Sequence, residues 1–247
     1  MRNVSIIFIG LVCYVFAIGT ASAVVVLPGM IDDFETGTTM SWVKGSSPRS
    51  DASALPPINL ANGDESNRFL EVHSHGGIPD PFYRDAHSRM VFFNEAQWAG
   101  DYSQIGSISM KMKAVSAENL YMRLAIYDSG PDRVYSRYVS SVPTVLAADG
   151  KWHDISLSLA VTDLSRFRGE RTAEEVLSDV SHLRILSSMD YADAWGVDKI
   201  LATLGVDDIT AVAISTPVTT VPVPAAIWFM FSALFCLTGM SKYNRKV

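Results

Sequence analysis

Two stretches of the sequence decide the fold: Ser107-Ile-Ser-Met-Lys-Met-Lys-Ala114 and Leu120-Tyr-Met-Arg-Leu-Ala-Ile-Tyr127. In both, apolar residues alternate with mostly polar ones, which is typical of an antiparallel strand with one buried and one exposed face. Only residues 115–119 separate the two stretches, so we expect the two strands to form a hairpin. Helical periodicity is nearly absent from the body of the chain, residues 24–220, which favours an all-β fold for this part.

The remaining central region adds further strands and one helix. Stretches rich in strand-forming residues predict strands at 69–73, 89–93, 134–140, 153–159, 183–187 and 204–212. Thr172-Ala-Glu-Glu175 has the pattern of a capping box, in which the threonine caps a short helix. About nine strands and a single helix predict an antiparallel β-sandwich.

The first 23 residues have the features of a secretory signal peptide. Arg2 supplies a basic start, residues 4–19 form an apolar segment, and Ala21-Ser-Ala23 matches the A-x-A pattern of a cleavage site. We expect this signal helix to be removed by signal peptidase, so that the exported protein begins at Val24.

The chain ends in three consecutive features: the motif Val221-Pro222-Val223-Pro224-Ala225, an uncharged apolar run to Met240, and a basic tip with Lys242, Arg245 and Lys246. The run is short for a hydrophobic helix that spans a bilayer, which needs about 17–25 residues, so it suits a transient anchor. The basic tip favours a cytoplasmic end. An ordinary C-terminal membrane helix is the alternative.

This arrangement resembles the PEP-CTERM sorting tail of Gram-negative bacteria, in its V-P-x-P-A variant. The resemblance implies that an exosortase, a membrane cysteine protease, recognises the tail and cuts near the proline motif. It also implies an exported protein that is briefly anchored in the inner membrane and ends in the cell envelope, at the outer surface or in the extracellular matrix.

Without the two ends, the composition of the body is acidic and free of thiols. Four of the 20 basic residues lie in the ends and all 26 acidic residues lie in the body, which leaves a net charge of about −10. Such a charge argues against nucleic acid or anionic lipid as a partner. Cys13 and Cys236 also lie in the ends, so the body has no disulfide and no cysteine nucleophile. We expect a signal peptide at 1–23, one sandwich domain at 24–214, a polar stalk at 215–220 and the sorting tail at 221–247.

Three clusters of the body resemble known jelly rolls. Asp32-Asp-Phe-Glu-Thr-Gly37 with Trp42, and Gly205-Val-Asp-Asp-Ile209, resemble the first and last strands of carbohydrate-binding modules and galactose-binding-like domains. The middle part resembles the laminin-B (laminin IV-type) domain, at 92–98, 100–103, 106–109, 149–157 and 176–185. The resemblance is patchy and runs from residue 32 to about 212. It implies an antiparallel jelly-roll sandwich with an adhesive or ligand-binding role, and it assigns no catalytic residues.

The same resemblance implies a structural Ca²⁺ between the first and last strands. Calcium takes six to eight oxygen ligands from carboxylates and carbonyls. We expect Glu35 and Asp208 as ligands, with Asp33 possible. Asp207 and Asp208 face opposite ways on a regular strand, so only one of the two can reach the same ion. These acids could equally cap and solvate strand ends.

Aromatic side chains in loops suit the faces of sugar rings. The candidates for stacking on a glycan are Tyr83, Trp98, Tyr135, Tyr138, Tyr191 and Trp195. Trp42 and Trp152 are expected instead to pack the core or to brace a strand end. His73-Ser-His75 could chelate a transition metal from one strand face, although ordinary strand-end histidines are favoured.

The sequence therefore favours an exported, exosortase-processed surface protein whose jelly-roll domain binds a glycan or a matrix component and catalyses nothing. The chain has no G-x-S-x-G motif for a serine hydrolase. A secreted glycan hydrolase or lyase on the same sandwich is the first alternative, because paired carboxylates need to be close only in space. A purely structural matrix protein is the second.

Overall fold

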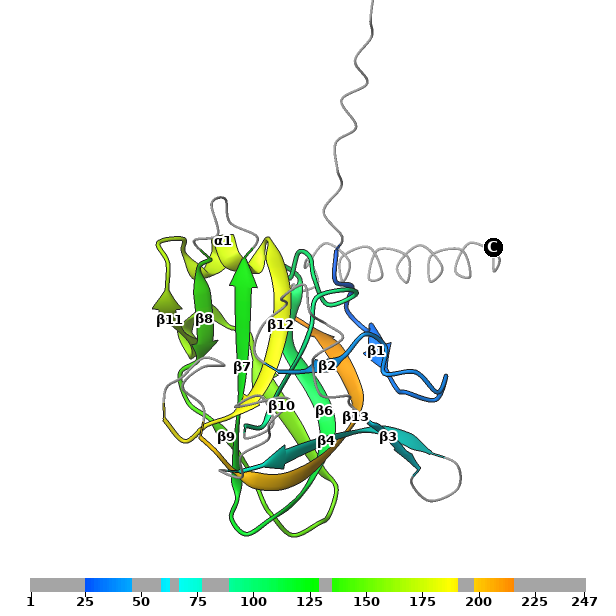
Figure 1. Ribbon diagram of the computed structural model, residues 1–247. Coiled ribbons are helices and arrows are strands. Elements are labelled where there is room, and N and C mark those ends of the chain that lie inside the picture. The colour runs from blue at the N-terminus through cyan, green and yellow to red at the C-terminus, as the bar shows by residue number, and fades with distance from the viewer. Residues whose placement is uncertain are drawn as a thin grey trace, which may run out of the picture. The chain divides into compact units, whose positions relative to one another are not determined.

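The computed structural model describes residues 25–45, 59–62, 67–76, 89–128, 135–190 and 198–215. Within these ranges the chain forms two antiparallel sheets that pack face to face (Figure 1). The expected signal peptide and sorting tail lie outside the described residues. No helix in the described part of the chain is long and apolar enough to cross a membrane.

The first sheet, the β6 sheet, has the strand order β10–β6–β13–β4–β3, and β1 also pairs with β13. Its strands are β1 (Ile31–Asp32), β3 (Asn59–Asn62), β4 (Arg68–His75), β6 (Ile105–Ser116), β10 (His153–Ser158) and β13 (Leu201–Ala213).

The second sheet, the β7 sheet, has the order β11–β8–β7–β12–β5–β2, and β9 also pairs with β7. Its strands are β2 (Val43–Lys44), β5 (Val91–Asn94), β7 (Leu120–Asp128), β8 (Arg137–Ser140), β9 (Thr144–Leu146), β11 (Leu164–Arg168) and β12 (Val180–Ser187). A 3-10 turn, η5 (Val161–Asp163), precedes β11, and α1 (Ala173–Leu177) precedes β12. Figure 1 shows α1 at the end of the sandwich beside β7 and β8.

The predicted fold class, an antiparallel sandwich with one short helix, is confirmed. The capping box is present at the start of α1, where Thr172 Oγ1 accepts from Glu175 N and Glu175 Oε2 accepts from Thr172 N. The alternating residues of both decisive stretches point into one core. They are Ile108, Met110, Met112 and Ala114 from β6, and Leu120, Met122, Leu124 and Ile126 from β7.

The predicted hairpin between these two stretches is wrong. β6 pairs with β10 and β13, whereas β7 pairs with β12, β8 and β9, so the two strands belong to opposite sheets. Residues 117–119 cross from one sheet to the other, and a link of this length can span the roughly 10 Å between packed sheets. Alternation shows only which face of each strand is buried. A hairpin within one sheet and a crossing between two packed sheets bury the same faces, so the pattern cannot distinguish them.

A buried carboxylate links the start of the chain to both sheets. Asp32 of β1 accepts hydrogen bonds from the indole Nε1 atoms of Trp42 and Trp98, each at 2.7 Å, and from Gln97 Nε2 at 3.2 Å. Trp42 directly precedes β2 of the β7 sheet, and Trp98 lies between β5 and β6. The carboxylate and both indoles are buried. Because β1 pairs with β13, this group joins both sheets and the last strand.

Replacing Asp32 with asparagine keeps the shape of the side chain but turns one acceptor oxygen into an NH₂ donor. That donor must then face another donor, an indole N–H or the amide of Gln97. We expect Asp32→Asn to lower the free energy of unfolding by roughly 2–4 kcal/mol, because hydrogen bonds to buried charged groups are strong and orphaned donors are costly. Urea unfolding measures this change.

Asp33→Asn is the matched control. The Asp33 side chain accepts one exposed bond, from Glu35 N at 3.2 Å, so its loss should cost no more than about 0.5 kcal/mol. Equal losses at the two neighbouring positions would show that the buried carboxylate does not hold the sheets together.

A second, smaller cluster lies on the outer side of the β7 sheet and contains the ring of Tyr127. The His182 ring stacks on Tyr127 at 4.2 Å, and the Arg184 guanidinium lies 3.9 Å from the same ring. Burial, and then the charge of Arg137, lowers the pKa of His182 to about 4. Ser181 Oγ directs its single hydrogen to the backbone carbonyls of Tyr127 and Asp128. It therefore accepts the hydrogen bond that it shares with His182 Nδ1. His182 Nε2 then carries no proton.

This histidine predicts a pH dependence of stability. The pKa of His182 falls from an ordinary 6.5 to about 4 on folding, so the unfolded chain binds the proton more strongly. The contribution of neutral His182 to the free energy of unfolding is complete above pH 6.5. This contribution, roughly 3 kcal/mol, is lost as the pH falls toward 4. In urea unfolding at pH 7 and pH 5, His182→Gln should lose less stability between the two than the parent. Parallel losses in both proteins would contradict the assignment.

Candidate functional site

The outer face of the β6 sheet carries an exposed aromatic group. Trp152, which directly precedes β10, is 39% exposed, and its ring stands at 85° to that of Phe69 on β4, with the centroids 5.2 Å apart. Lys113 of β6 lies against both rings, its Nζ atom 4.0 Å from the Phe69 centroid and 4.8 Å from that of Trp152. We call Trp152, Phe69 and Lys113 the Trp152 platform.

A tight turn sets Trp152 in this position. Asp149 Oδ1 accepts from Lys151 N at 3.0 Å and interacts with His153 Nε2 at 2.9 Å, and Gly150 N donates to Ala114 O at 3.0 Å. Gly150 has a φ of +70°, which suits glycine better than residues with a side chain. An Asp-Gly pair is typical of such tight turns.

A glycine forms the floor of the platform. A Cβ atom at Gly205 of β13 would lie 2.9 Å from both Cγ and Cε of Lys113 and 3.2 Å from Cε2 of Phe69. The bare backbone therefore allows the lysine stem to lie flat across β13. The flat stem brings the ammonium group over the rings.

A shallow depression of about 230 Å³ lies on the same face of the β6 sheet, farther along β10 from Trp152. Its lining includes Asp154, Ser156 and Ser109, whose side chains make no hydrogen bond to any residue that the structure describes. Lys111 Nζ, by contrast, donates to Asp208 Oδ2 at 2.7 Å, and this bond raises the pKa of Lys111. The depression therefore offers hydroxyl groups and one carboxylate to a polar ligand.

The three described aromatic residues that were predicted to stack on sugars do not belong to this platform. Trp98 is fully buried against Asp32, and Tyr138 is buried with its hydroxyl donating to Arg171 O, so neither presents a ring face to the surface. Tyr135 is half-buried against the Tyr127 cluster. Tyr83, Tyr191 and Trp195 lie outside the described residues.

Sequence reasoning missed the Trp152 platform because Trp152 was expected to pack the core or brace a strand end. The alternation does contain the signal: Trp152 is two residues from Asp154 and therefore shares its outward face. Its contact with Phe69 and Lys113 depends on sheet order, which alternation does not reveal.

The four acids considered as candidate calcium ligands all have protein partners. Glu35 Oε1 accepts from Arg68 N at 3.0 Å, and Asp207 Oδ2 accepts from Asn67 Nδ2 at 3.2 Å. Asp33 and Asp208 accept the bonds already given. Burial raises the pKa of Asp207. In the described ranges, no three carboxylate, imidazole or thiol side chains gather closely enough to hold a metal ion.

The expected opposite orientation of Asp207 and Asp208 is wrong. Val206 and Ile209 both point into the core, and the pairing of β13 with β6 shifts register between Asp207 and Thr210. Asp208 has a φ of +52°. This β-bulge places two consecutive residues between core positions, so both acids lie toward the outer face.

The calcium hypothesis remains a prediction. The first and last strands that calcium would connect do pair, as β1 with β13. Calcium at a free concentration of one hundred times its Kd stabilises the folded state by about 2.7 kcal/mol. Removal of the ion by EDTA should therefore lower the melting temperature by several degrees. Glu35→Gln should remove that response. The same melting temperature in EDTA and in calcium would show that the protein donors alone hold these acids.

The histidine pair does not form a chelate in the structure. His73 interacts through Nε2 with Glu71 Oε1 at 2.7 Å and through Nδ1 with Thr203 Oγ1 at 3.1 Å, so both ring nitrogens have protein partners. His75 is exposed at the end of β4.

No protein-family model matches the chain, and no curated protein matches its sequence. Among solved structures, the chain is similar to a family 11 carbohydrate-binding module from Clostridium thermocellum in complex with a β-1,3-1,4-mixed-linked tetrasaccharide. The identity is 15% and the TM-score is 0.48, over 78% of this chain and 98% of the other.

It is also similar to the L4b domain of human laminin α-2, with 12% identity and a TM-score of 0.46, over 76% of this chain and 98% of the other. The CBM22-1 xylan-binding domain from Paenibacillus barcinonensis Xyn10C matches with 14% identity and a TM-score of 0.39, over 77% of this chain and 98% of the other. Likenesses this distant leave the function to be argued from the residues of this chain.

Proposed function

We propose that the body is a non-catalytic glycan-binding domain of an exported protein, and that its glycan stacks on the Trp152 platform. The observation that carries the proposal is the exposure of Trp152 on an outer sheet face, beside hydroxyl and carboxylate groups with no described hydrogen-bond partner. A large indole ring held at 39% exposure leaves apolar area in water that a ligand can cover.

A sugar ring fits this combination better than an apolar ligand or a peptide. One face of a pyranose carries C–H groups that pack on an aromatic ring, and its edge carries hydroxyl groups that both donate and accept. The Asp154 carboxylate accepts hydrogen bonds, and the hydroxyl groups of Ser156 and Ser109 both donate and accept them. This set of groups matches the hydroxyl edge of a sugar ring. The Lys113 ammonium group contacts both the Phe69 ring and the indole ring and so holds the indole in place.

The carboxylates near the platform support binding over catalysis. Glycoside hydrolysis needs two carboxyl groups placed on either side of the scissile bond. Asp207 is bound to Asn67 and Asp208 to Lys111, which leaves Asp154 as the one carboxylate without a hydrogen bond among the described residues of the depression. Asp154 can therefore hold a hydroxyl group of the glycan, whereas Asp208, the other carboxylate of the depression, already accepts from Lys111.

Trp152→Ala tests the binding face. A glycan array on residues 24–214 identifies the bound glycans, and calorimetry then compares variants. Trp152→Ala should weaken binding at least tenfold, a loss of about 1.4 kcal/mol that is typical of a stacking aromatic. Phe167→Ala is the matched control, because Phe167 is also 39% exposed but lies on β11 of the other sheet.

Equal affinity of Trp152→Ala and the parent protein would reject the platform. Release of shortened or unsaturated sugars from a bound glycan would favour the hydrolase or lyase alternative. A folded protein that binds no glycan on the array would favour the structural matrix protein.

Export and processing form the second half of the proposal. They are supported by the sequence alone: the signal peptide at 1–23 and the Val221–Ala225 motif with its apolar run and basic tip. Signal peptidase and an exosortase are the processing partners, and the destination is the envelope or extracellular matrix of a Gram-negative bacterium.

Mass spectrometry of the protein from its own host tests this half. The mature chain should begin at Val24 and end near Pro224. Replacing Pro222 and Pro224 with alanine should leave the uncut form in the membrane fraction. Intact Val247 on most parent molecules would contradict exosortase processing.

A further inference from the structure

Strand β10 carries a row of polar residues that begins at Trp152. β10 is an end strand of the β6 sheet, and its outward positions after Trp152 are Asp154, Ser156 and Ser158. Outward residues on a strand repeat about every 7 Å, so the row from Trp152 to Ser158 is about 20 Å long. An end strand also presents backbone N–H and C=O groups that have no partner strand on one side.

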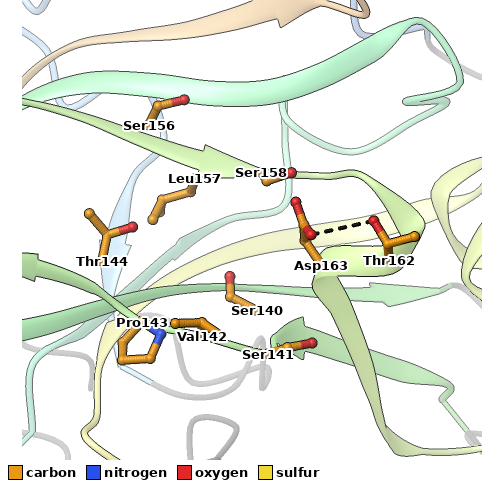
Figure 2. Close-up of a pocket in the computed structure, with 10 residues that line it drawn as sticks. All are labelled: Ser140, Ser141, Val142, Pro143, Thr144, Ser156, Leu157, Ser158, Thr162 and Asp163. Atoms are coloured by element: carbon orange, nitrogen blue, oxygen red, sulfur yellow. Dashed lines mark hydrogen bonds between the residues drawn. The ribbon is translucent and has the colours of Figure 1, made fainter.

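A second pocket lies at the far end of this row, between β10 and the segment that joins β8 to β9. Its volume is about 280 Å³, and Figure 2 shows side chains from both sheets and from η5 around it. Hydroxyl groups dominate the lining, which includes Ser140, Ser141, Thr144, Ser156, Ser158 and Thr162. Among the described residues of this lining, Asp163 is the one that carries a charge.

Ser156 connects the two cavities, because it lines both the depression beside Asp154 and this pocket. The Trp152 platform, the depression and the pocket are therefore consecutive along one strand.

Several hydroxyl groups of this pocket can bind a ligand. The side chains of Ser156 and Thr144 make no hydrogen bond to any described residue. Ser158 Oγ accepts from Ala160 N at 3.1 Å and keeps its own hydrogen to donate. These groups are suited to the many hydroxyl groups of a sugar chain.

Charge discriminates between kinds of sugar chain. Asp154 makes no hydrogen bond to a described residue, and Asp163 accepts only a weak side-chain bond from Thr162 at 3.3 Å. Lys111, the cation in the described lining of the depression, is neutralised by Asp208. Asp154 on the row and Asp163 in the pocket repel an anionic ligand over about 8 Å at physiological ionic strength, whereas the one cation of the platform, Lys113, lies against its rings at the other end of the row.

We propose that β10 is a multi-sugar binding track for a neutral, linear glycan chain, which runs from the Trp152 platform over Ser156 into the hydroxyl-lined pocket. This inference rests on the proposed glycan-binding function and extends it to a ligand class. It predicts that affinity increases with chain length until the pocket is filled, and that chains of uronic acids bind more weakly than neutral chains of the same length.

The test uses calorimetry on residues 24–214 with a neutral array hit prepared as a series from disaccharide to hexasaccharide, and with the uronic acid counterpart of the longest member. The hexasaccharide should bind at least tenfold more tightly than the disaccharide.

Ser156→Tyr places a bulky ring on the exposed junction and should reduce hexasaccharide affinity to that of the disaccharide. Ser178→Tyr is the control, because Ser178 is also an exposed serine but directly follows α1, which packs beside β7 and β8. Asp154→Asn with Asp163→Asn should narrow the preference for neutral chains.

The outcomes separate the track from the proposed function. If Trp152→Ala abolishes binding but chain length and Ser156→Tyr have no effect, the platform stands and the track is wrong. Equal or tighter binding of the uronic acid chain would overturn the proposed ligand class. Loss of hexasaccharide affinity in Ser178→Tyr as large as in Ser156→Tyr would also overturn the track. Melting curves verify that each variant is folded.

Discussion

The structure depends on one buried carboxylate, that of Asp32, which accepts hydrogen bonds from the indoles of Trp42 and Trp98. A charge in this position is tolerated only because donors surround it, and the donors are satisfied only because the carboxylate is there. The three residues come from the first strand, the entry to the second sheet and the crossing between sheets. In a body without cysteine, this group ties distant parts of the chain together, a role that disulfides have in many exported domains.

The closed core leaves the two outer sheet faces free for different roles. Outside the β7 sheet, Tyr127, His182 and Arg184 pack into a buried cluster. Outside the β6 sheet, the absence of a side chain at Gly205 lets Lys113 lie flat and support the exposed ring of Trp152. The same sheet that holds Asp32 in β1 therefore presents the platform, the depression and the end strand β10. The proposed binding surface and the core therefore lie on opposite faces of one sheet.

Much of the fold could be predicted from the sequence, and the failures have physical causes. Alternation identified the buried faces of β6 and β7 and the capping box identified α1, because both are local patterns. Alternation could not tell a hairpin from a crossing between sheets. It could not locate the bulge at Asp207 and Asp208, and composition could not distinguish buried Asp32 from the partly exposed Asp33. The Trp152 platform and Gly205 beneath it come from four strands or strand ends that only the order of the strands brings together.

The most direct test of the account is a titration of the protein with its glycan, followed through the indole N–H signals in a ¹H–¹⁵N NMR spectrum. Trp42 and Trp98 serve as internal references, because their indole N–H groups are buried and bound to Asp32. On binding, the Trp152 signal should move while the signals of Trp42 and Trp98 remain in place. A Trp152 signal that stays unchanged while the glycan binds would contradict the account, because the ligand would then lie on another face of the sandwich.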